Sequence, residues 1–596
     1  MFTLFSVGIF LLSIGTSYSA DLAELNAAIQ ARGAKWVAGE TSVSSLPREL
    51  KQRLCGLKYD TPENLNGHVV SGRPRSVTSS SSFGASYSPF CSTTDPVCLW
   101  TNRGGRNYVT SVKDQGQCGS CWAFSSTAVL ESESLISFNQ PGLSLNLSEQ
   151  IVLSCTSEYL NESSGDDCDG GYPSHAGTLL ANWGTNLETC LPYASYNYGE
   201  YPGSGAACAN ACSNYWSNPS TNYYINSWSV SYPTYYVWGN ISEQVQNMKN
   251  LLYQGPIVGT MDVYDDFYYY TGGVYLCDPN WGSGYQGSHA IAIVGWNDDL
   301  QAFLVKNSWG TGWGMQGFFW ISYYELSGWT YFAEYAYFFN GGKHTPIINF
   351  LSVPSGLQIA STGSSYYTPV QLEWETGSLV SVQAVSPQSV SSGCQYVFTH
   401  WSNGTKTQTL TFTELLVGGE SYTAYFNTQY QLTITTNPSG AGTVSPTSGT
   451  WYNANKSAPI SAKPISGSGY TFFGWSGDVT GAKNPVSVIM SKPYNVTANF
   501  AQFGLVAPIA GNTISSSDSP YQIQWTGPSS LVTYNVSYSI NGGATWKAIA
   551  SGLPSPNYSW SLPTVTKATK CLIKVVAYNG KTVIKQLSSG AFTITP

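Results

Sequence analysis

The segment Val112–Ser125, VKDQGQCGSCWAFS, carries Cys118 and Cys121 as a CxxC pair directly before an apolar stretch. The spacing alone leaves three alternatives open: a redox pair, half of a zinc site, or half of an ordinary disulfide beside an unrelated cysteine. Gly116 and Gly119 predict a tight loop, and the apolar residues after Cys121 predict a helix. A thiol at a helix N-terminus faces unpaired N–H groups and the positive end of the helix dipole, which favour the thiolate. Cys121 is therefore predicted to be a nucleophile.

A thiolate in acyl transfer needs a proton partner, a group that orients this partner, and donors for the oxyanion. Of the five histidines, His289 lies in GSHAIAIVGW, where it is predicted to begin a buried apolar strand. Eighteen residues later, Asn307 lies in FLVKNSWGTGWG, on a second predicted strand before a turn rich in tryptophan and glycine. Each residue alone is more often a buried structural side chain. The prediction of a site depends on their combination with Cys121.

Four segments, QGQCGSCWAF, CDGGYP, GSHAIAIVGW and KNSWGTGWG, occur in the order typical of the papain family of cysteine peptidases. The chain resembles this family from about Asn107 to Phe339. The resemblance implies an α+β fold: a papain-like two-lobed catalytic domain, with a helical lobe and a β-barrel lobe, followed by all-β modules. It also implies a catalytic set that attacks a peptide carbonyl and forms a thioester, which water hydrolyses. The set consists of Cys121 as nucleophile, His289 as general base and acid, Asn307 as orienting amide and Gln115 as oxyanion donor.

The resemblance further implies a backbone-binding strip, a pocket for an apolar or aromatic side chain, and an indole over the contact between the histidine and the amide. These substrate-facing residues are Gly170, Gly171, Tyr172, Pro173, Thr260 and Trp309. The pocket floor maps near Ala336, although the family's preceding Cys-Gly is replaced here by Tyr331-Phe332. Ser288 stands before the histidine where many relatives carry Asp or Asn.

Thirteen cysteines in an exported chain favour disulfides over metal sites, and their odd number requires at least one free thiol. The resemblance makes Cys118 a half-cystine rather than part of a redox pair. The pairs that it implies are Cys118–Cys168, Cys155–Cys208 and Cys190–Cys212. Cys91 and Cys98 are close enough in sequence to pair locally. The remaining cysteines have no predicted partner.

The N-terminal part is predicted to be removed during maturation. Residues 1–19 form an uncharged apolar run that ends in small residues, which is typical of a signal peptide; a buried N-terminal helix is the alternative. Residues 21–40 have apolar positions at helical spacing, and residues 76–88 form a serine-rich linker. Cys55-Gly56 resembles the dipeptide of cathepsin B-type pro-segments that lies across the active-site cleft. A stray thiol in an exposed loop is the alternative.

The C-terminal part contains a repeat. YVFTHWSNG matches YTFFGWSGD, and YTAYF matches VTANF, both at a separation of 74 residues. The modules resemble repeats of bacterial surface proteins, with an immunoglobulin- or fibronectin-like module last. Trp401, Trp451 and Trp475 are interpreted as core residues, with stacking on sugars as the alternative. The predicted domains are 1–19 signal peptide, 20–85 pro-region, 86–342 peptidase, 343–428 and 429–502 β-repeats, and 503–596 β-sandwich.

Composition also distinguishes the N-terminal part of the chain from the C-terminal part, and it excludes several classes of protein. Only 10 % of residues are charged and 14 % are aromatic, which argues against a disordered chain, a coiled coil and a polybasic nucleic-acid binder. Residues 1–342 carry 13 basic and 27 acidic side chains, whereas residues 343–596 carry 12 lysines, no arginine and 6 acidic side chains. No spacing of His, Cys, Asp and Glu predicts a metal site, and no cofactor is expected.

The predicted function is a cysteine endopeptidase made as a zymogen, with protein or peptide substrates and its own pro-region as inhibitor. Residues 190–224, which correspond to the His-bearing occluding loop of the carboxypeptidase cathepsin B, contain no histidine, which favours internal cleavage. Secretion to the extracellular space or periplasm is expected, without a membrane span in the mature form. Two alternatives stay open: a cell-surface or glycan-binding adhesin with a secondary peptidase domain, and an acyl transferase that uses the same acyl-enzyme.

Overall fold

The computed structural model describes residues 17–60, 65, 91–160, 166–194, 207–217, 221–234, 237, 239–413 and 420–596. Most of the predicted signal peptide and the whole serine-rich linker lie outside the described residues. Two compact units are present. They are Met1–Asn349 with Gln371–Val380 and Phe412–Glu420, and Phe350–Val370 with Ser381–Thr411 and Ser421–Pro596.

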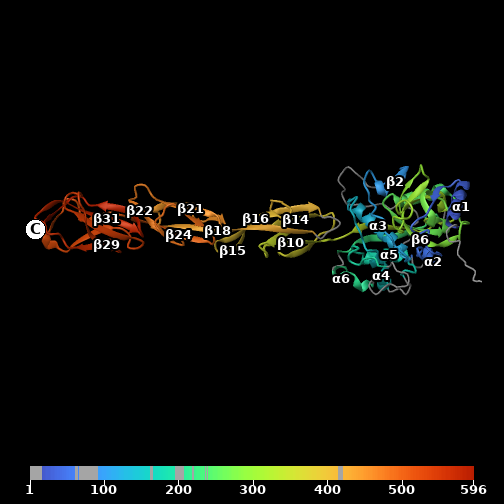
Figure 1. Ribbon diagram of the computed structural model, residues 1–596, viewed down its shortest axis with the longest axis horizontal. Coiled ribbons are helices and arrows are strands. Elements are labelled where there is room, and N and C mark those ends of the chain that lie inside the picture. The colour runs from blue at the N-terminus through green and yellow to red at the C-terminus, as the bar shows by residue number, and fades with distance from the viewer. Residues whose placement is uncertain are drawn as a thin grey trace, which may run out of the picture. The chain divides into compact units, whose positions relative to one another are not determined.

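The first unit combines helices with one large sheet (Figure 1), so the predicted α+β class is confirmed. Helix α3 is buried along almost its whole length, because α4, α5, β6 and β9 all pack against it. None of the described helices is long and apolar enough to cross a membrane. The helices are α1 (Ser17–Ala31), α2 (Arg48–Arg53), α3 (Cys121–Ser137), α4 (Glu149–Leu160), α5 (Pro173–Asn182), α6 (Ser213–Ser217) and α7 (Ile241–Leu252), with 3-10 turns η1 (Trp100–Asn102), η2 (Cys208–Asn210), η5 (Asp265–Tyr269) and η6 (Tyr323–Leu326).

The sheet of this unit has nine strands in the order β1-β5-β8-β7-β6-β4-β9-β3, with β2 paired to β6. Its central strand β6 is buried over nearly its whole length, in agreement with the apolar run that predicted it. Strands β4 and β7 flank β6 in antiparallel pairing. The strands are β1 (Lys35–Ala38), β2 (Val97–Leu99), β3 (Tyr224–Ser231), β4 (Ile257–Tyr264), β5 (Tyr270–Tyr275), β6 (Tyr285–Asn297), β7 (Ala302–Lys306), β8 (Phe318–Ser322) and β9 (Ala336–Lys343).

The N-terminal segment differs from its predicted helix. Helix α1 ends at Ala31, because Gly33 adopts a left-handed conformation with φ of 68°. Trp36, which was expected on the helix, lies on β1 opposite Gly273 of β5. The segment therefore contributes a helix and an added strand to the first unit.

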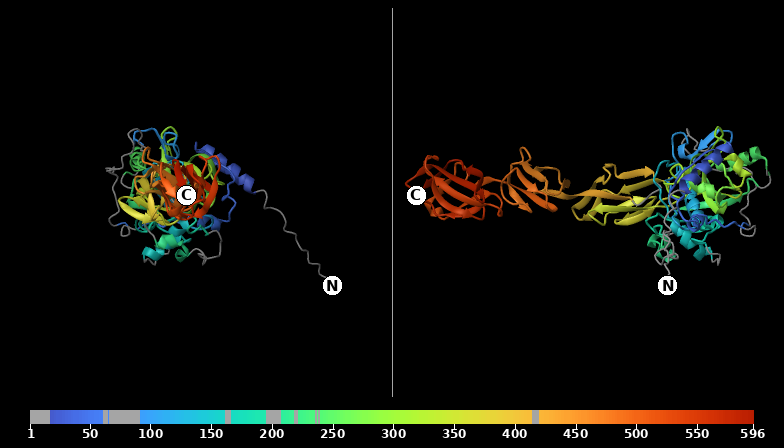
Figure 2. Two further views of the ribbon diagram at one scale, coloured as in Figure 1. Left: turned by 90° about the vertical axis from the view of Figure 1, so that its left-hand side faces the viewer. Right: turned by 45° about the vertical axis from the view of Figure 1, so that its right-hand side comes forward.

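The second unit consists of strands and one described 3-10 turn, η7 (Ser516–Asp518), and Figure 2 shows the strands of its last module in red from two directions. In this last module, sheets β26-β33-β31-β28-β29 and β25-β27-β30 enclose one buried apolar cluster. The strands from β10 on, the first and some others of which straddle the two units, are β10 (Ile347–Val353), β11 (Gln358–Ser361), β12 (Ser364–Tyr367), β13 (Val370–Glu373), β14 (Leu379–Ala384), β15 (Gln388–Ser391), β16 (Cys394–Trp401), β17 (Thr409–Thr413), β18 (Ser421–Asn437), β19 (Gly442–Ser445), β20 (Thr450–Asn453), β21 (Ser457–Pro464), β22 (Tyr470–Gly477), β23 (Val486–Ile489), β24 (Tyr494–Gln502), β25 (Gly504–Ala507), β26 (Thr513–Ser515), β27 (Tyr521–Thr526), β28 (Thr533–Ser539), β29 (Lys547–Leu553), β30 (Asn557–Trp560), β31 (Ala568–Asn579), β32 (Thr582–Ser588) and β33 (Phe592–Thr595).

The two repeat copies form the same antiparallel strand pair. In the first, β16 pairs antiparallel with β18, and Phe398 faces Phe426 directly before a register shift. In the second, β22 pairs antiparallel with β24, and Phe472 faces Phe500 directly before a register shift. Both facing residues and the shift recur at the 74-residue separation read from the sequence.

The repeat tryptophans are mostly interior. Trp401 and Trp475 are at most 1 % exposed, whereas Trp451 is half-buried. The indole N–H of Trp401 donates to the Gln408 carbonyl (3.2 Å), and that of Trp475 to the Lys483 carbonyl (3.0 Å). Trp401 and Trp475 therefore stabilise the strand pair of their own repeat copy, and the faces of these two rings are not accessible for stacking on a sugar.

Candidate active site

Cys121 is the first residue of α3, at the end of a tightly constrained loop. The disulfide between Cys118 and Cys168 anchors this loop, and the Gly119 N–H donates to the Cys168 carbonyl (2.8 Å). A Cβ on Gly119 would lie 2.6 Å from that carbonyl oxygen, so only glycine fits there. The Ala290 N–H donates to Sγ of Cys121 (3.5 Å), which places the thiol beside β6.

His289 and Asn307 are brought together by neighbouring strands. Nε2 of His289 lies 2.8 Å from Oδ1 of Asn307, which also accepts the Ser308 N–H (2.8 Å). Both side chains are at most 3 % exposed. Two predicted boundaries are wrong: β6 begins at Tyr285, four residues before His289, and β7 ends at Lys306, so Asn307 begins the following turn.

An aromatic cluster covers this pair. The ring of Trp309 lies 4.9 Å from that of His289, between centroids, and stacks on Tyr268 at 5.4 Å. Trp313 meets Trp309 edge-on at 5.1 Å. Because these rings are almost fully buried, they exclude water from the contact between His289 and Asn307.

Gln115 is fully buried, and its side-chain amide has a fixed orientation. Its Oε1 accepts the Ser308 hydroxyl (2.6 Å), so Nε2 must point the other way. Nε2 donates to the Cys118 carbonyl (2.7 Å) and to the Leu54 carbonyl (3.2 Å). The oxyanion donor predicted from the sequence therefore holds a backbone carbonyl from the N-terminal part of the chain.

Residues 54–60, here named the blocking segment, pass through the site. The Gly171 N–H donates to the Gly56 carbonyl (2.9 Å), and the Lys58 N–H donates to the Gly171 carbonyl (2.9 Å). The Leu57 N–H donates to the Ser288 carbonyl (3.0 Å). Cys55-Gly56 thus lies against the catalytic residues, and the alternative of a stray exposed thiol is wrong.

Burial shifts the pKa values of both Cys121 and His289. It raises the pKa of Cys121 to about 11, although the Ala290 and Gly56 N–H groups oppose the rise. It lowers the pKa of His289 to about 4, although Asn307 and the Leu54 carbonyl oppose the fall. The expected thiolate is therefore absent at neutral pH while the segment is bound, because removal of water from the thiol outweighs its place at the helix N-terminus.

Alkylation of Cys121 by iodoacetamide is expected to accelerate at least about 100-fold at pH 7 when the pro-region is removed. The thiolate fraction is about 10⁻⁴ for a pKa near 11 and about 10⁻² for an ordinary cysteine, and access to the sulfur adds to this difference. With the pro-region bound, the rate should keep rising with pH up to about 11, where the thiol ionises. Mass spectrometry of the Cys121 peptide measures the rate. Half-buried Cys394 is the internal control, and equal Cys121 rates in both forms would disprove the blocking role.

Among the other predicted substrate-facing residues, Gly170 lies against the blocking segment. Gly170 has φ of 122°, and a Cβ there would lie 2.7 Å from the Gly56 carbonyl oxygen. Tyr172 and Pro173 begin α5. Thr260 is fully buried on β4, where its hydroxyl accepts the Tyr335 N–H (3.1 Å).

One acidic residue near the site has no sequence motif. Asp262 on β4 is directly opposite Ser288 on β6, and its Oδ1 accepts the Ser288 hydroxyl (2.7 Å) and the Tyr59 hydroxyl (3.1 Å). A carboxyl group is thus held beside Ser288 from the neighbouring strand. Only the register of β4 on β6 reveals this pairing.

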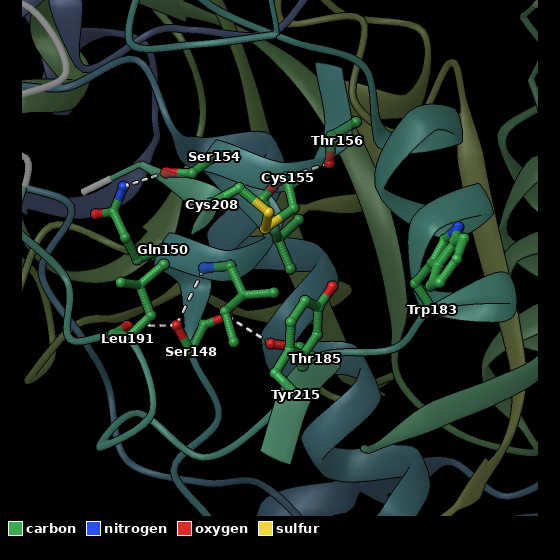
Figure 3. Close-up of a disulfide and its surroundings, with 12 residues drawn as sticks. Ser148, Gln150, Ser154, Cys155, Thr156, Trp183, Thr185, Leu191, Cys208 and Tyr215 are labelled. Atoms are coloured by element: carbon green, nitrogen blue, oxygen red, sulfur yellow. Dashed lines mark hydrogen bonds between the residues drawn. A yellow bond between two sulfur atoms is a disulfide. The ribbon is translucent and has the colours of Figure 1, made fainter. Parts of the chain in front are cut away.

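The remaining disulfides hold the helical part. Cys155 of α4 is joined to Cys208 of η2, and Figure 3 shows this bond with Ser148 nearby. The Ser148 hydroxyl donates to the Leu191 carbonyl (2.6 Å) and accepts the Ile151 N–H (3.1 Å), which fixes the start of α4. Cys190–Cys212 and Cys91–Cys98 are also paired, so the three pairs expected from the resemblance and the local pair are all present. Five cysteines are free: Cys55, Cys121, Cys277, Cys394 and Cys571.

A buried charge network lies behind the site. Nζ of Lys113 contacts Glu131 (2.9 Å) and Glu149 (2.6 Å), and both carboxylates are at most 2 % exposed. Lys306, which precedes Asn307, donates to the Thr110 hydroxyl (3.0 Å), and that hydroxyl donates to Glu131. Residues of this network and Asn307 line a cavity of about 10 Å³. No cluster of His, Cys, Asp and Glu suited to a metal ion occurs in the described part of the chain.

Known proteins resemble two parts of the chain. Residues 98–333 match the family described as "Papain family cysteine protease", and residues 432–504 match "Divergent InlB B-repeat domain". "Cathepsin B-like cysteine proteinase 5" of Caenorhabditis elegans is 32 % identical over 232 residues, which cover 35 % of this chain and 64 % of that protein. "Cathepsin L" of Sarcophaga peregrina is 30 % identical over 271 residues, which cover 44 % of this chain and 69 % of that protein. The solved proCathepsin B S9 from Trypanosoma congolense matches with a TM-score of 0.41 at 20 % identity, covering 53 % of this chain and 97 % of that one.

Proposed function

We propose, from the premise that this chain belongs to the papain family of cysteine proteases, that it is an exported endopeptidase made as an inactive precursor. Proteins or peptides would be its substrates, and residues 20–85 its inhibitor. The observation that carries the proposal is the hydrogen bond from Gln115 to the Leu54 carbonyl, beside buried Cys121 and His289. A site for acyl transfer requires a donor placed to bind a carbonyl oxygen, and the amide N–H of Gln115 already binds one.

The proposed mechanism follows from the contacts of the histidine. Nε2 of His289 is engaged by Asn307, whereas Nδ1 meets no partner at hydrogen-bond geometry in the described chain. Nδ1 would take the proton of Cys121, and the thiolate would attack the peptide carbonyl. Nε2 of Gln115 and the Cys121 N–H would stabilise the oxyanion, and His289 would protonate the leaving amine. Water would then hydrolyse the thioester, while Asn307 acts as a positioning residue.

Inhibition is proposed to depend on occupation of the same groups. The Leu54 carbonyl takes the Gln115 donor, and the Gly56 carbonyl takes the Gly171 N–H that a substrate backbone would need. With the segment bound, burial holds the pKa of Cys121 well above neutral, so little thiolate would be available to attack either carbonyl. Separation of the segment would free the donors and readmit water to both catalytic side chains.

Export and the domain boundaries are supported by composition and pairing. The apolar residues 1–19 and four disulfides are typical of a chain that folds in an oxidising compartment. We retain the predicted boundaries of the pro-region at 20–85 and the peptidase at 86–342. The β-modules from 343 on would space or tether the peptidase.

Gly56→Ala is expected to activate the precursor without removal of the pro-region. The added Cβ would lie 1.9 Å from the Gly119 carbonyl oxygen, so the blocking segment must move away from the site. We expect at least about tenfold faster alkylation of Cys121 and measurable peptidase activity in the uncleaved chain, since even about 1.4 kcal/mol of lost contact shifts binding tenfold.

Gly33→Asn is the matched control for this variant. Gly33 is also in the pro-region, its Cβ would meet no atom within 4 Å, and asparagine tolerates its left-handed φ. This control should remain as inactive as the unmodified precursor. A Gly56→Ala chain with unchanged alkylation and no activity would show that the close packing on Gly119 is not what holds the segment.

A further inference from the structure

The blocking segment ends in a buried carboxylate. Asp60 is 3 % exposed, and its two oxygens accept the hydroxyls of Ser174 and Tyr337. These two hydroxyl-bearing residues are themselves at most 1 % exposed. We name Ser174 and Tyr337 the hydroxyl pair.

The hydroxyl pair belongs to the catalytic unit and not to the pro-region. Ser174 follows Tyr172-Pro173 at the start of α5, and Tyr337 follows Ala336 on β9. The resemblance places the principal specificity pocket at these neighbouring positions. A peptide chain that contacts Gly171, as the blocking segment does, can therefore also reach the hydroxyl pair.

The surroundings of Asp60 bear both signs of charge. His175, the next residue of α5, pairs with Asp166 (2.7 Å), and it favours the ionised form of Asp60 while Asp166 disfavours it. Burial dominates and raises the pKa of Asp60 above its usual range, although both hydroxyl hydrogen bonds oppose the rise. A buried carboxyl group is tolerated here because the two oriented hydroxyls donate the hydrogen bonds that water would otherwise supply.

Loss of the pro-region removes the only acceptor that these described hydroxyls are seen to bind. When the pro-region leaves, water would take its place at these donors, and a ligand that displaces this water without restoring both bonds loses roughly 1–3 kcal/mol for each buried donor. An apolar side chain would leave both donors unsatisfied. The apolar or aromatic guest that the family resemblance implies is therefore a poor match for this site.

We infer that Ser174 and Tyr337 are specificity-determining residues that bind the carboxyl side chain of an Asp or Glu residue in the peptide substrate. This inference rests on the proposed peptidase function and deepens it. The blocking segment would inhibit by presenting the same chemical group, Asp60, to the same donors. The contacted substrate residue should lie within three residues of the scissile bond on its N-terminal side, where the pocket is expected.

Matched fluorogenic peptides test this inference on the full chain. A cleavage site for an unrelated protease, placed within residues 76–88, allows removal of the pro-region. Peptides that differ only by Asp, Glu, Ala or Leu at each of the three positions before the scissile bond are then compared. We expect kcat/KM to be at least about tenfold higher with Asp or Glu than with Leu at one position, which is the effect of about 1.4 kcal/mol. Tyr337→Phe and Ser174→Ala should each reduce this preference about tenfold, measured as the ratio of kcat/KM for the Asp or Glu peptide to kcat/KM for the Leu peptide.

Tyr275→Phe is the matched control. It also removes a tyrosine hydroxyl that donates to a buried carboxylate, in this case Asp266 (2.8 Å), away from the hydroxyl pair. The control should keep the acidic preference. A preference for Leu at all three positions, or an acidic preference that survives Tyr337→Phe, would overturn the inference while the peptidase function stands.

A binding measurement separates this failure from failure of the proposed function. The Cys121→Ala chain without its pro-region is titrated calorimetrically with a peptide of residues 48–60 and with its Asp60→Leu version. We expect at least about tenfold weaker binding of the Asp60→Leu peptide, and no difference between the two in Tyr337→Phe. Equal binding of both peptides to the parent chain overturns the site itself. If no fluorogenic peptide is cleaved, the peptidase function fails, and the substrate inference fails with it.

Discussion

Cys121→Ala is expected to lower kcat/KM for internal peptide bonds at least about 10⁴-fold once the pro-region has been removed. The substitution removes the atom that would form the thioester, and only substrate binding and the oxyanion donors remain. The variant should stay folded, because the Ala290 N–H lies 3.5 Å from Sγ, and the loss of so long a hydrogen bond costs little. Quenched fluorescent peptides measure the rate, and mass spectrometry of their fragments identifies the bonds cleaved.

Cys571→Ala is the matched control for this prediction. Cys571 is also a free buried cysteine, but it lies on β31 of the last module. Its loss should leave kcat/KM within about twofold. Retained cleavage in Cys121→Ala would refute the nucleophile, whereas products shortened only in dipeptide steps would refute internal cleavage and leave the peptidase chemistry intact.

The candidate catalytic residues could be named from the sequence because each of them lies in a contiguous motif. Gln115 and Cys121 share one loop, and the glycine at 119 is required by the close approach to Cys168. The segments around His289 and Asn307 are equally distinctive. Motifs of this kind encode local backbone geometry, so the residues can be named before any pairing between strands is known.

The contacts of Asp262 and Asp60 could not be predicted in this way. Asp262 reaches Ser288 through the register of β4 on β6, and the two residues are 26 positions apart. Asp60 reaches Tyr337 across 277 positions. Such contacts depend on how distant elements pack, and neither carboxylate has a local signature.

Some secondary-structure elements could not be predicted correctly for a related reason. The glycine-rich segment GGYPSHAG is typical of a turn, but its His175 lies on α5, where Pro173 occupies the first helical position. The aromatic run that follows Asp265 and Asp266 is typical of a strand, but these two residues begin the turn η5 before β5. In both cases an apolar or glycine-rich pattern was compatible with more than one local structure, and the packing of the unit decides between them.

The pKa values of Cys121 and His289 also could not be predicted from the position of Cys121 on the helix alone. The sequence places Cys121 at a helix N-terminus, which favours the thiolate, but burial raises its pKa to about 11 in the precursor, where the blocking segment lies against the site. The segment lies more than 60 residues earlier in the chain, so its effect enters only with the folded arrangement. The same sequence is thus expected to have a neutral pair with the pro-region bound and an ionised pair without it.

Lys113→Met is expected to destabilise the catalytic unit by about 3–5 kcal/mol, because it leaves two buried carboxylates without their cation. Glu131 and Glu149 are at most 2 % exposed and share this one lysine (2.9 and 2.6 Å). For a unit of this size, the loss corresponds to a Tm lower by roughly 6–20 °C. Differential scanning calorimetry of the full chain measures the shift. The surface pair of Arg103 and Asp95 (3.5 Å) provides the control, and Arg103→Met should cost less than about 1 kcal/mol.

The pH dependence of this loss distinguishes unpaired charge from lost packing. Burial already raises the pKa of Glu149 to about 7 in the presence of Lys113, and removal of the lysine must raise it further. A carboxyl whose pKa is higher in the folded state than in the unfolded state opposes folding increasingly as the pH rises above its unfolded value near 4.5. The difference in Tm between the parent and Lys113→Met should therefore be larger at pH 8 than at pH 5, and adding Glu149→Gln should reduce it at pH 8. A difference that is equal at both pH values would mean that Lys113 acts through packing of its aliphatic chain, and not by neutralising the carboxylates behind Asn307.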